Sequence, residues 1–221
     1  MKISVPKGAC DTHMHFYDQA VPGAPGTFLP GHFPVEDYRA LQKKLGLERV
    51  IVVQANAYKD DNRVIVDSIK KLGKNAKGVA VVMPGVADAQ IERLTKAGIC
   101  AVRIMTLHGG TLGFDVMDQV MARVHPFGWH ANIQLDGREL PKYEAQIKRL
   151  PGKFVIDHTG KFLEPVAPER MMWASNWPHP SVPKEKRPAD EDLLDLLLDW
   201  APDEKTRKKI LVDNPAELYG F

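Results

Sequence analysis

The chain has 221 residues, with 30 lysines and arginines against 28 aspartates and glutamates and a formal net charge of +2. This length suffices for one domain with a sizeable core, and because the basic residues are spread along the chain rather than clustered, we expect no nucleic-acid partner. Residues 1–7 lack the apolar core of a signal peptide and no apolar stretch is long enough to span a bilayer, so we expect a single cytoplasmic domain over residues 1–221 that binds no membrane.

Apolar runs rich in β-branched residues alternate with amphipathic segments along the chain. Strands are predicted at residues 9–16, 49–55, 77–83, 101–107, 129–136, 153–158 and 171–175. Helices are predicted at residues 34–45, 62–72, 87–97, 115–125, 139–150, 190–200 and 203–211. Strands that are apolar on both faces and separated by helices indicate a parallel sheet. Regular alternation is typical of a doubly wound sheet or a (β/α)8 barrel, and the lack of Gly-x-Gly-x-x-Gly after the first strand disfavours a dinucleotide-binding fold.

The number of β/α units falls one short of a complete barrel. Seven strands are predicted instead of eight, and the dozen residues between His158 and Met171 are too few for a parallel crossover with its helix. A whole barrel usually has about 250 residues. We therefore predict a TIM-like (β/α)8 barrel that lacks one β/α unit near residues 165–166. The irregular stretch 17–33, rich in Pro and Gly, is expected to be an active-site loop.

The most informative motif is Asp-Thr-His-Met-His at residues 11–15, which closes the first predicted strand. Side chains alternate between the faces of a strand, so His13 and His15 point the same way. Two adjacent imidazoles can bind a metal, a carboxylate or the oxygens of a small substrate. A site is favoured over a structural pair, because barrels build their active sites from polar residues at strand ends.

Two later strand ends carry further polar groups. Of the adjacent residues Asp157 and His158, only one is expected to face the site, and we expect this to be His158, with Asp157 in a supporting network. Asn176 follows the last predicted strand, in a turn that prolines stiffen. Arg103 lies inside an apolar strand and needs an anionic partner, which is either a protein carboxylate or a substrate carboxylate.

A metal site would need three or four ligands, and His13, His15 and His158 could supply three. However, no histidine closes the strand predicted at 129–136, and the last strand offers the amide of Asn176 where a carboxylate would help to bind an ion and orient water. We therefore favour a site that works without a metal or another cofactor.

These motifs resemble the amidohydrolase superfamily, and within it the branch of metal-independent lactone-processing enzymes. The matching segments are residues 10–15, 51–55, 155–161, 176–179 and 211–215. The resemblance covers nearly the whole chain except for the region after Pro165. It implies a carboxylated lactone as the small-molecule substrate.

The resemblance also implies residue roles. The catalytic set is His13, His15, His158 and Asn176, and the substrate-binding set is Asn56, Arg103, Gln134, Lys161 and His179. Lactone hydrolases of this branch carry an aspartate, which serves as the base that activates water, at the position of Asn176, whereas the isomerase pattern reads Asn-Trp-Pro-His as this chain does.

An isomerisation needs only the substrate's own hydroxyl to attack the carbonyl, so loss of the aspartate harms it less than hydrolysis. We therefore predict an isomerase that converts a 1,5-lactone of a sugar diacid into the 1,4-lactone. The alternatives are a lactone hydrolase, with or without a metal, and a non-catalytic truncated remnant.

Overall fold

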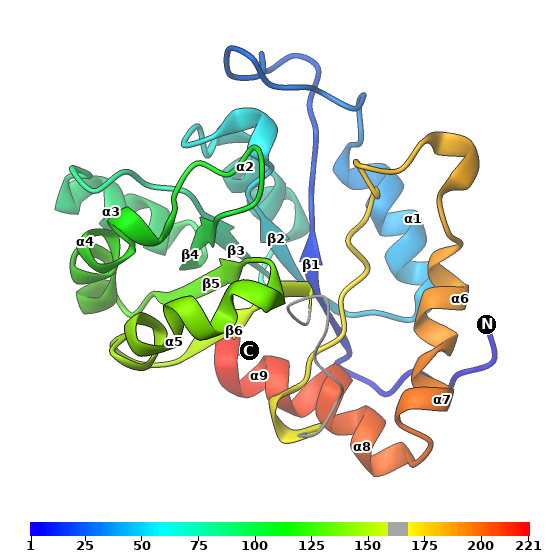
Figure 1. Ribbon diagram of the computed structural model, residues 1–221. Coiled ribbons are helices and arrows are strands. Elements are labelled where there is room, and N and C mark those ends of the chain that lie inside the picture. Colours follow the sequence, from blue (N-terminus) through cyan, green and yellow to red (C-terminus); the bar gives the residue numbers. More distant parts are fainter. Residues whose placement is uncertain (159–167) are drawn as a thin grey trace.

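The computed structural model describes residues 1–158 and 168–221 and shows a curled parallel sheet wrapped by helices (Figure 1). The strands are β1 (Cys10–Met14), β2 (Arg49–Val53), β3 (Ala76–Ala80), β4 (Ile99–Met105), β5 (His130–Gln134) and β6 (Phe154–Ile156). They pair in chain order, each parallel to the next. Within the described residues the fold is therefore an open part of a barrel, which confirms the predicted TIM-like class.

Helices follow the strands as predicted, with bounds that differ by one or two residues over the first five. They are α1 (Val35–Leu45), α2 (Arg63–Leu72), α3 (Asp88–Lys96), α4 (Phe114–Val124), α5 (Leu140–Lys148), α6 (Asp190–Asp195), α7 (Leu197–Trp200), α8 (Glu204–Lys208) and α9 (Asn214–Tyr219). The helix predicted at 190–200 is split into α6 and α7, and a π-helical turn, Lys209–Asp213, joins α8 to α9. None of the described helices is long and apolar enough to cross a membrane.

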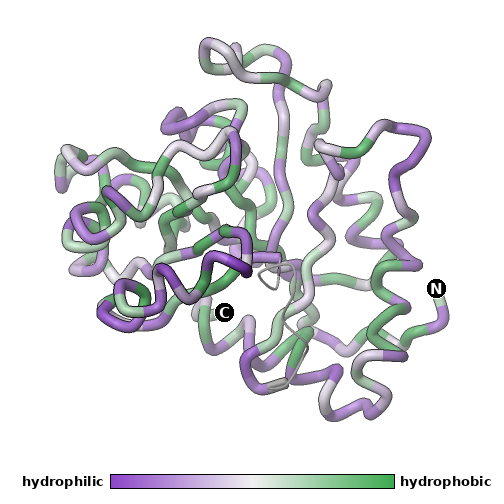
Figure 2. Tube along the Cα trace, in the orientation of Figure 1, coloured by the Kyte–Doolittle hydropathy of each residue, from purple (hydrophilic) through white to green (hydrophobic). Residues whose placement is uncertain are grey.

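Local sequence explains how the helices end and pack. Gly46 terminates α1 with a positive φ of 74°, a conformation that favours glycine. Gly78 in β3 lets α2 approach the sheet closely, because a Cβ atom there would lie 2.6 Å from the Ile69 side chain and 2.5 Å from that of Ile99. Figure 2 shows hydrophobic residues concentrated on the central strands, while hydrophobic and hydrophilic residues alternate along the outer helices.

The interior of the curled sheet is filled from below by the C-terminal helix. Tyr219 of α9 packs against side chains from the first four strands, namely Cys10, Ile51, Val53, Val79 and Ala101. A separate cluster joins the C-terminal helices to the beginning of the chain, where Leu197 and Leu211 are buried with Ile3 and Leu45. The last fifty residues therefore close the base of the sheet and the side next to β1.

The segment predicted as a seventh strand at 171–175 is not a strand, which corrects that prediction. It runs beside β1, and Thr12 N–H donates to the carbonyl of Trp173 at 3.1 Å. The ladder is interrupted at the next step, because Ser175 N–H donates to the Asp11 carboxylate rather than to a backbone carbonyl. A side chain thus replaces a backbone acceptor, and regular pairing does not form.

Candidate active site

His13 and His15 lie together inside the curled sheet, both almost fully buried. Their Nε2 atoms are 3.2 Å apart, and His15 Nδ1 lies 2.9 Å from the carbonyl oxygen of Val53 in β2. A carbonyl oxygen only accepts, so the hydrogen of neutral His15 is assigned to Nδ1 and its Nε2 is an acceptor. Burial lowers the pKa of His15 well below its ordinary value of 6.5, and the nearby His13 and Arg103 add to this effect.

Asp157 follows β6 and lies against the histidine pair. Its Oδ1 is 3.1 Å from Nδ1 of His13, and the alignment at Nδ1 makes this a charge contact more than a directed hydrogen bond. With its amide nitrogen turned toward Asp157, Asn132 of β5 donates to both carboxylate oxygens at 2.6 and 3.0 Å. Burial raises the pKa of Asp157, but His13 and Arg103 outweigh burial and bring it below its ordinary value. The carboxylate is therefore ionised.

Arg103 of β4 forms a second cluster beside the histidines. Its guanidinium donates to the carbonyl of Gln54 at 2.6 Å, to Oδ1 of Asn56 at 3.1 Å and to Oε1 of Gln134 at 2.7 Å. Within the described part of the chain these hydrogen-bond partners are all neutral oxygens, so no directly bonded carboxylate neutralises the positive charge. Burial lowers the pKa of Arg103, while the charge of Asp157 opposes this.

His158 and Asn176 both lie next to His13. The ring centroids of His13 and His158 are 5.1 Å apart, and the backbone N–H of Asn176 donates to the carbonyl of His13 at 2.8 Å. Both residues adopt a positive φ, 56° for His158 and 57° for Asn176, which is uncommon outside glycine. The backbone thus turns sharply at both points where the chain enters the site.

Asp11 of the Asp-Thr-His-Met-His motif holds this arrangement together from below. It is fully buried and accepts hydrogen bonds from Tyr38 Oη at 2.9 Å, from Ser175 Oγ at 2.5 Å and from the backbone N–H groups of Ser175 and His13. Burial raises the pKa of Asp11, and the hydrogen bonds from Ser175 and Tyr38 only partly offset this. Asp11 therefore fastens the segment that carries Asn176 to the strand that carries the histidines.

The remaining predicted site residues are placed differently. Asn56 and Gln134 both bond Arg103, and Asn56 also donates to the sulfur of Met105. His179 lies 3.0 Å from the carboxylate of Asp190 at the start of α6, a contact that ties its turn to the C-terminal helices. Lys161, like the predicted junction at 165–166, lies outside the described residues.

Sequence reasoning missed Asn132, Asp11 and Tyr17 as parts of this site. Tyr17 begins the loop 17–33, its ring centroid is 6.4 Å from that of His15, and Arg103 is close enough to influence its hydroxyl. Burial raises the pKa of Tyr17, so the phenol keeps its hydrogen. The signal was present, because residues 13, 15 and 17 continue the period of two that places side chains on one face of a strand.

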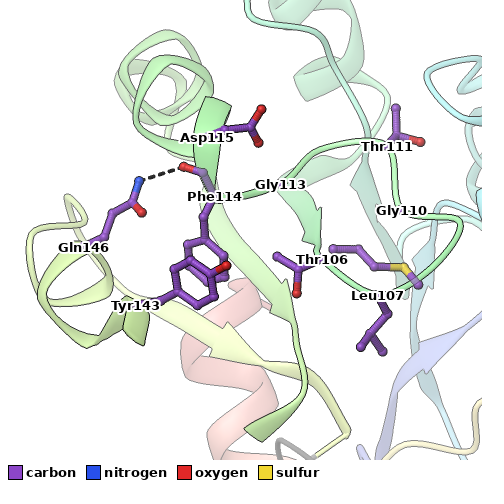
Figure 3. Close-up of a pocket in the computed structure, with 10 residues that line it drawn as sticks. Thr106, Leu107, Gly110, Thr111, Gly113, Phe114, Asp115, Tyr143 and Gln146 are labelled. Atoms are coloured by element: carbon purple, nitrogen blue, oxygen red, sulfur yellow. Dashed lines mark hydrogen bonds between the residues drawn. The ribbon is translucent and has the colours of Figure 1, made fainter. Parts of the chain in front are cut away.

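A hollow of about 550 Å³ opens beside this cluster, at the carboxyl end of β4 (Figure 3). Thr106, Thr111 and Asp115 line it, and Phe114 and Tyr143 stack on one side with ring centroids 3.9 Å apart. The histidines do not line this hollow; it adjoins the Arg103 cluster through Met105, which contacts Asn56. We place the chemistry at the histidine pair, because the polar groups converge there.

The chain is similar in sequence to known proteins. The family model described as amidohydrolase matches residues 10–167 and 161–221. D-galactarolactone isomerase of Agrobacterium fabrum is 32% identical over 267 residues, covering 97% of this chain and 91% of the relative. A 4-sulfomuconolactone hydrolase of Rhizobium radiobacter is 29% identical, covering 100% of this chain and 92% of the relative. Lactone-processing enzymes are thus similar to this chain over its whole length.

Solved structures are similar to it as well. A protein of Agrobacterium tumefaciens in its apo form superposes with a TM-score of 0.91 at 31% identity, covering 98% of this chain and 95% of the other. A probable 2-pyrone-4,6-dicarboxylic acid hydrolase of Acinetobacter baumannii, solved with citric acid bound, superposes with a TM-score of 0.84 at 19% identity, covering 97% of this chain and 100% of the other. The second likeness shows the fold alone.

The alignments also bear on the predicted missing unit. The alignment with the isomerase extends over 267 residues and that with the hydrolase over 276, whereas this chain has 221. The relatives therefore contain residues that this chain lacks, and the two family matches meet at residues 161–167, where the junction was predicted. The family model matches the chain on both sides of that junction. The chain therefore belongs to the amidohydrolase family.

Proposed function

We propose that this chain is a lactone isomerase that acts on a carboxylated lactone of a sugar diacid, converting the 1,5-lactone into the 1,4-lactone without a metal or another cofactor. The observation that carries the proposal is Asn176, which follows the segment 171–175 and whose backbone bonds that of His13. At this position the chain offers a neutral amide instead of a carboxylate base for water. The similarity to D-galactarolactone isomerase over 97% of the chain supports the same choice.

The reaction needs a polarised carbonyl and a held substrate. Attack on a lactone carbonyl creates negative charge on its oxygen, and N–H groups aimed at that oxygen stabilise the transition state. In this proposal His13 and His158 polarise the carbonyl, His15 accepts a proton, and Asn176 orients the attacking hydroxyl. The attack is intramolecular, so no water has to be bound or activated.

Substrate recognition is assigned to the Arg103 cluster. The guanidinium is desolvated and bonded only to neutral oxygens among the described residues, so it can pair with a substrate carboxylate in a charge-assisted, bidentate way. Asn56 and Gln134 hold the guanidinium and can bond substrate hydroxyls. Lys161 is proposed as a second cation, and His179 as a residue that shapes the turn around Asn176. We propose the cytoplasm as the location, with no nucleic-acid partner.

The test follows D-galactaro-1,5-lactone by NMR in water enriched in oxygen-18, with mass spectrometry of the products. An isomerase yields the 1,4-lactone without label, because no water enters the product. Labelled open diacid formed directly from the 1,5-lactone would instead establish the hydrolase, which the similarity to lactone hydrolases makes the second candidate. Turnover of neither kind would indicate a non-catalytic remnant. Elemental analysis of protein purified without added metal tests the metal-free mechanism.

A further inference from the structure

We propose that Asp157 is a positioning residue that fixes the charge of the histidine pair, making His13 the acid and His15 the base of the reaction. The inference rests on the proposed isomerase function and assigns residue roles within it. The sequence-based expectation assigned His158 to the site and Asp157 to a supporting network, and the inference gives that supporting role a specific function.

The hydrogen positions follow from a chain of four groups. It runs from the carbonyl of Val53 to His15 at 2.9 Å, on to His13 at 3.2 Å and then to Asp157 at 3.1 Å. The carbonyl assigns a hydrogen to Nδ1 of neutral His15, so the Nε2 of His15 accepts from an N–H at Nε2 of His13. At the other end, the negative charge of Asp157, 3.1 Å from Nδ1 of His13, favours an N–H over a lone pair at that nitrogen. His13 thus carries hydrogens on both nitrogens, whereas His15 carries one.

The alternative places the hydrogen on Asp157 and leaves Nδ1 of His13 bare. Asn132 argues against it, because its amide donates to both oxygens of the carboxylate, at 2.6 and 3.0 Å. Donors favour the charged form of a carboxylate over the protonated one. The sheet provides this donor from β5, next to the strand that ends before Asp157.

Other charged or titratable groups face the pair from neighbouring elements. Arg103 from β4 and Tyr17 after β1 lie on one side, His158 is next to Asp157, and Tyr219 of α9 is near Asp157 from below. Among these, the positive charge of Arg103 disfavours a charge on resting His15. This supports one hydrogen on His15 and two on His13. Asp11 accepts from the backbone N–H of His13, whereas Asp157 is the described carboxylate that contacts an imidazole of the pair, that of His13.

The unequal pair suits an isomerisation. For the reaction the Nε2–H of His13 turns from His15 to the ring oxygen of the lactone, which frees the lone pair at Nε2 of His15. The substrate hydroxyl then attacks the lactone carbonyl carbon and gives its proton to that nitrogen while the new C–O bond forms. The ring C–O bond then breaks, and the departing oxygen takes the proton from Nε2 of His13. After release, the proton on His15 crosses the 3.2 Å gap to Nε2 of His13 and restores the starting state. No electron, water molecule or net proton is consumed.

Asp157→Asn tests the assignment, since it keeps the shape and removes the charge. We expect kcat at pH 7 to fall by about 10²- to 10³-fold with KM changed less than threefold, and kcat to rise again as the pH is lowered, because the variant lacks the carboxylate charge that favours the second hydrogen of the His13 imidazole. Asp157→Glu, which retains the charge, should recover part of the activity. Asp61→Asn, at a partly exposed aspartate paired with Arg63, is the matched control and should leave the profile unchanged.

Long-range proton–nitrogen NMR of the imidazoles gives a readout that does not depend on turnover. We expect the His13 signals of a doubly protonated ring at pH 7 in the native chain, and their loss in Asp157→Asn. If the native chain isomerises lactones but Asp157→Asn leaves both the pH profile and the His13 signals unchanged, the assignment is wrong while the function stands. If the signals change as expected but no lactone is isomerised, the function is wrong and the charge assignment stands. If Asp157→Asn does not fold, the native signals and the Glu variant decide.

Discussion

Two layers inside the curled sheet use the same strands for opposite purposes. In the lower layer Ala101 of β4 packs with apolar neighbours and Tyr219, and His130 of β5 contacts the same tyrosine ring. Two residues further along these strands, Arg103 and Asn132 belong to the polar cluster around the histidines. One step of the period-two alternation therefore separates the apolar packing below from the polar cluster above.

Each layer also contains a buried histidine, His130 in the lower layer and His15 in the upper layer. His130 lies in the lower layer, where Nε2 has no hydrogen-bond partner in the described structure, and burial lowers its pKa to about 4. His15 is held in the upper layer by Val53 and His13. Both imidazoles are neutral at pH 7, but only His15 has a lone pair beside a proton donor. Changes in the upper layer should therefore alter activity, and changes in the lower layer should alter stability.

The largest expected effect is that of His15→Gln. The variant can still donate to Val53 but loses the basic nitrogen that faces His13. We expect kcat for lactone isomerisation to fall by about 10³-fold with little change in the thermal midpoint. Steady-state kinetics and a melting curve on the same preparation check this. An equal loss of activity and of folded protein would contradict a purely chemical role.

Arg103→Met should act through substrate binding. Removal of the guanidinium takes away charge-assisted hydrogen bonds that are each worth about 1.5–3 kcal/mol. We expect KM for a dicarboxylated lactone to rise by about 100-fold, and much less for an uncharged lactone of the same ring. This contrast separates the two interpretations that the sequence left open, since a structural role for Arg103 would weaken turnover of both substrates alike.

His130 should make the free energy of unfolding depend on pH. Its folded pKa of about 4 lies below the ordinary 6.5, so between these values the unfolded chain binds a proton that the folded chain does not. Stability is therefore fully present above pH 6.5 and falls as the pH drops toward 4, by about 3 kcal/mol from this group. Urea unfolding of His130→Gln across the same range should show a shallower fall. Parallel curves for the two proteins would contradict it.

The smallest effect is expected in the lower layer of the sheet, at Tyr219. The hydroxyl of Tyr219 is buried without a hydrogen-bond partner in the described structure. Tyr219→Phe removes an unsatisfied polar atom and keeps the ring against His130, so we expect the free energy of unfolding to rise by about 1 kcal/mol. Isomerase activity should not change. A loss of stability in urea unfolding would show that this hydroxyl is bonded in solution.

The sequence predicted the repeating elements and most of the polar cluster, because both depend on local periodicity. The facing of His13 and His15 follows from alternation, and Arg103 was recognised as a charge in an apolar strand. Asp157 and His158 could not be separated by the same rule, since β6 ends at Ile156 and the backbone turns to a positive φ at His158, bringing both side chains to His13. Alternation applies only while the strand lasts.

Long-range contacts account for what the sequence did not predict. The segment 171–175 has a strand-like composition, yet the Asp11 carboxylate takes the place of a ladder acceptor and regular pairing fails. Nor did the sequence indicate that the imidazole of His179, 3.0 Å from Asp190, pairs with a carboxylate of another element. Both outcomes depend on partners that no window of neighbouring residues contains.

The carboxylate of Asp11 joins two parts of the chain that are 164 residues apart. A ribosome making this chain releases the histidine strand well before Ser175, so a growing polypeptide cannot complete the histidine cluster until Ser175 has emerged. Until then Asp11 must remain hydrated or borrow another donor. Assembly of the cluster thus waits for Ser175 during biosynthesis, and nascent fragments that stop before Ser175 should be inert even where their β/α units have already formed.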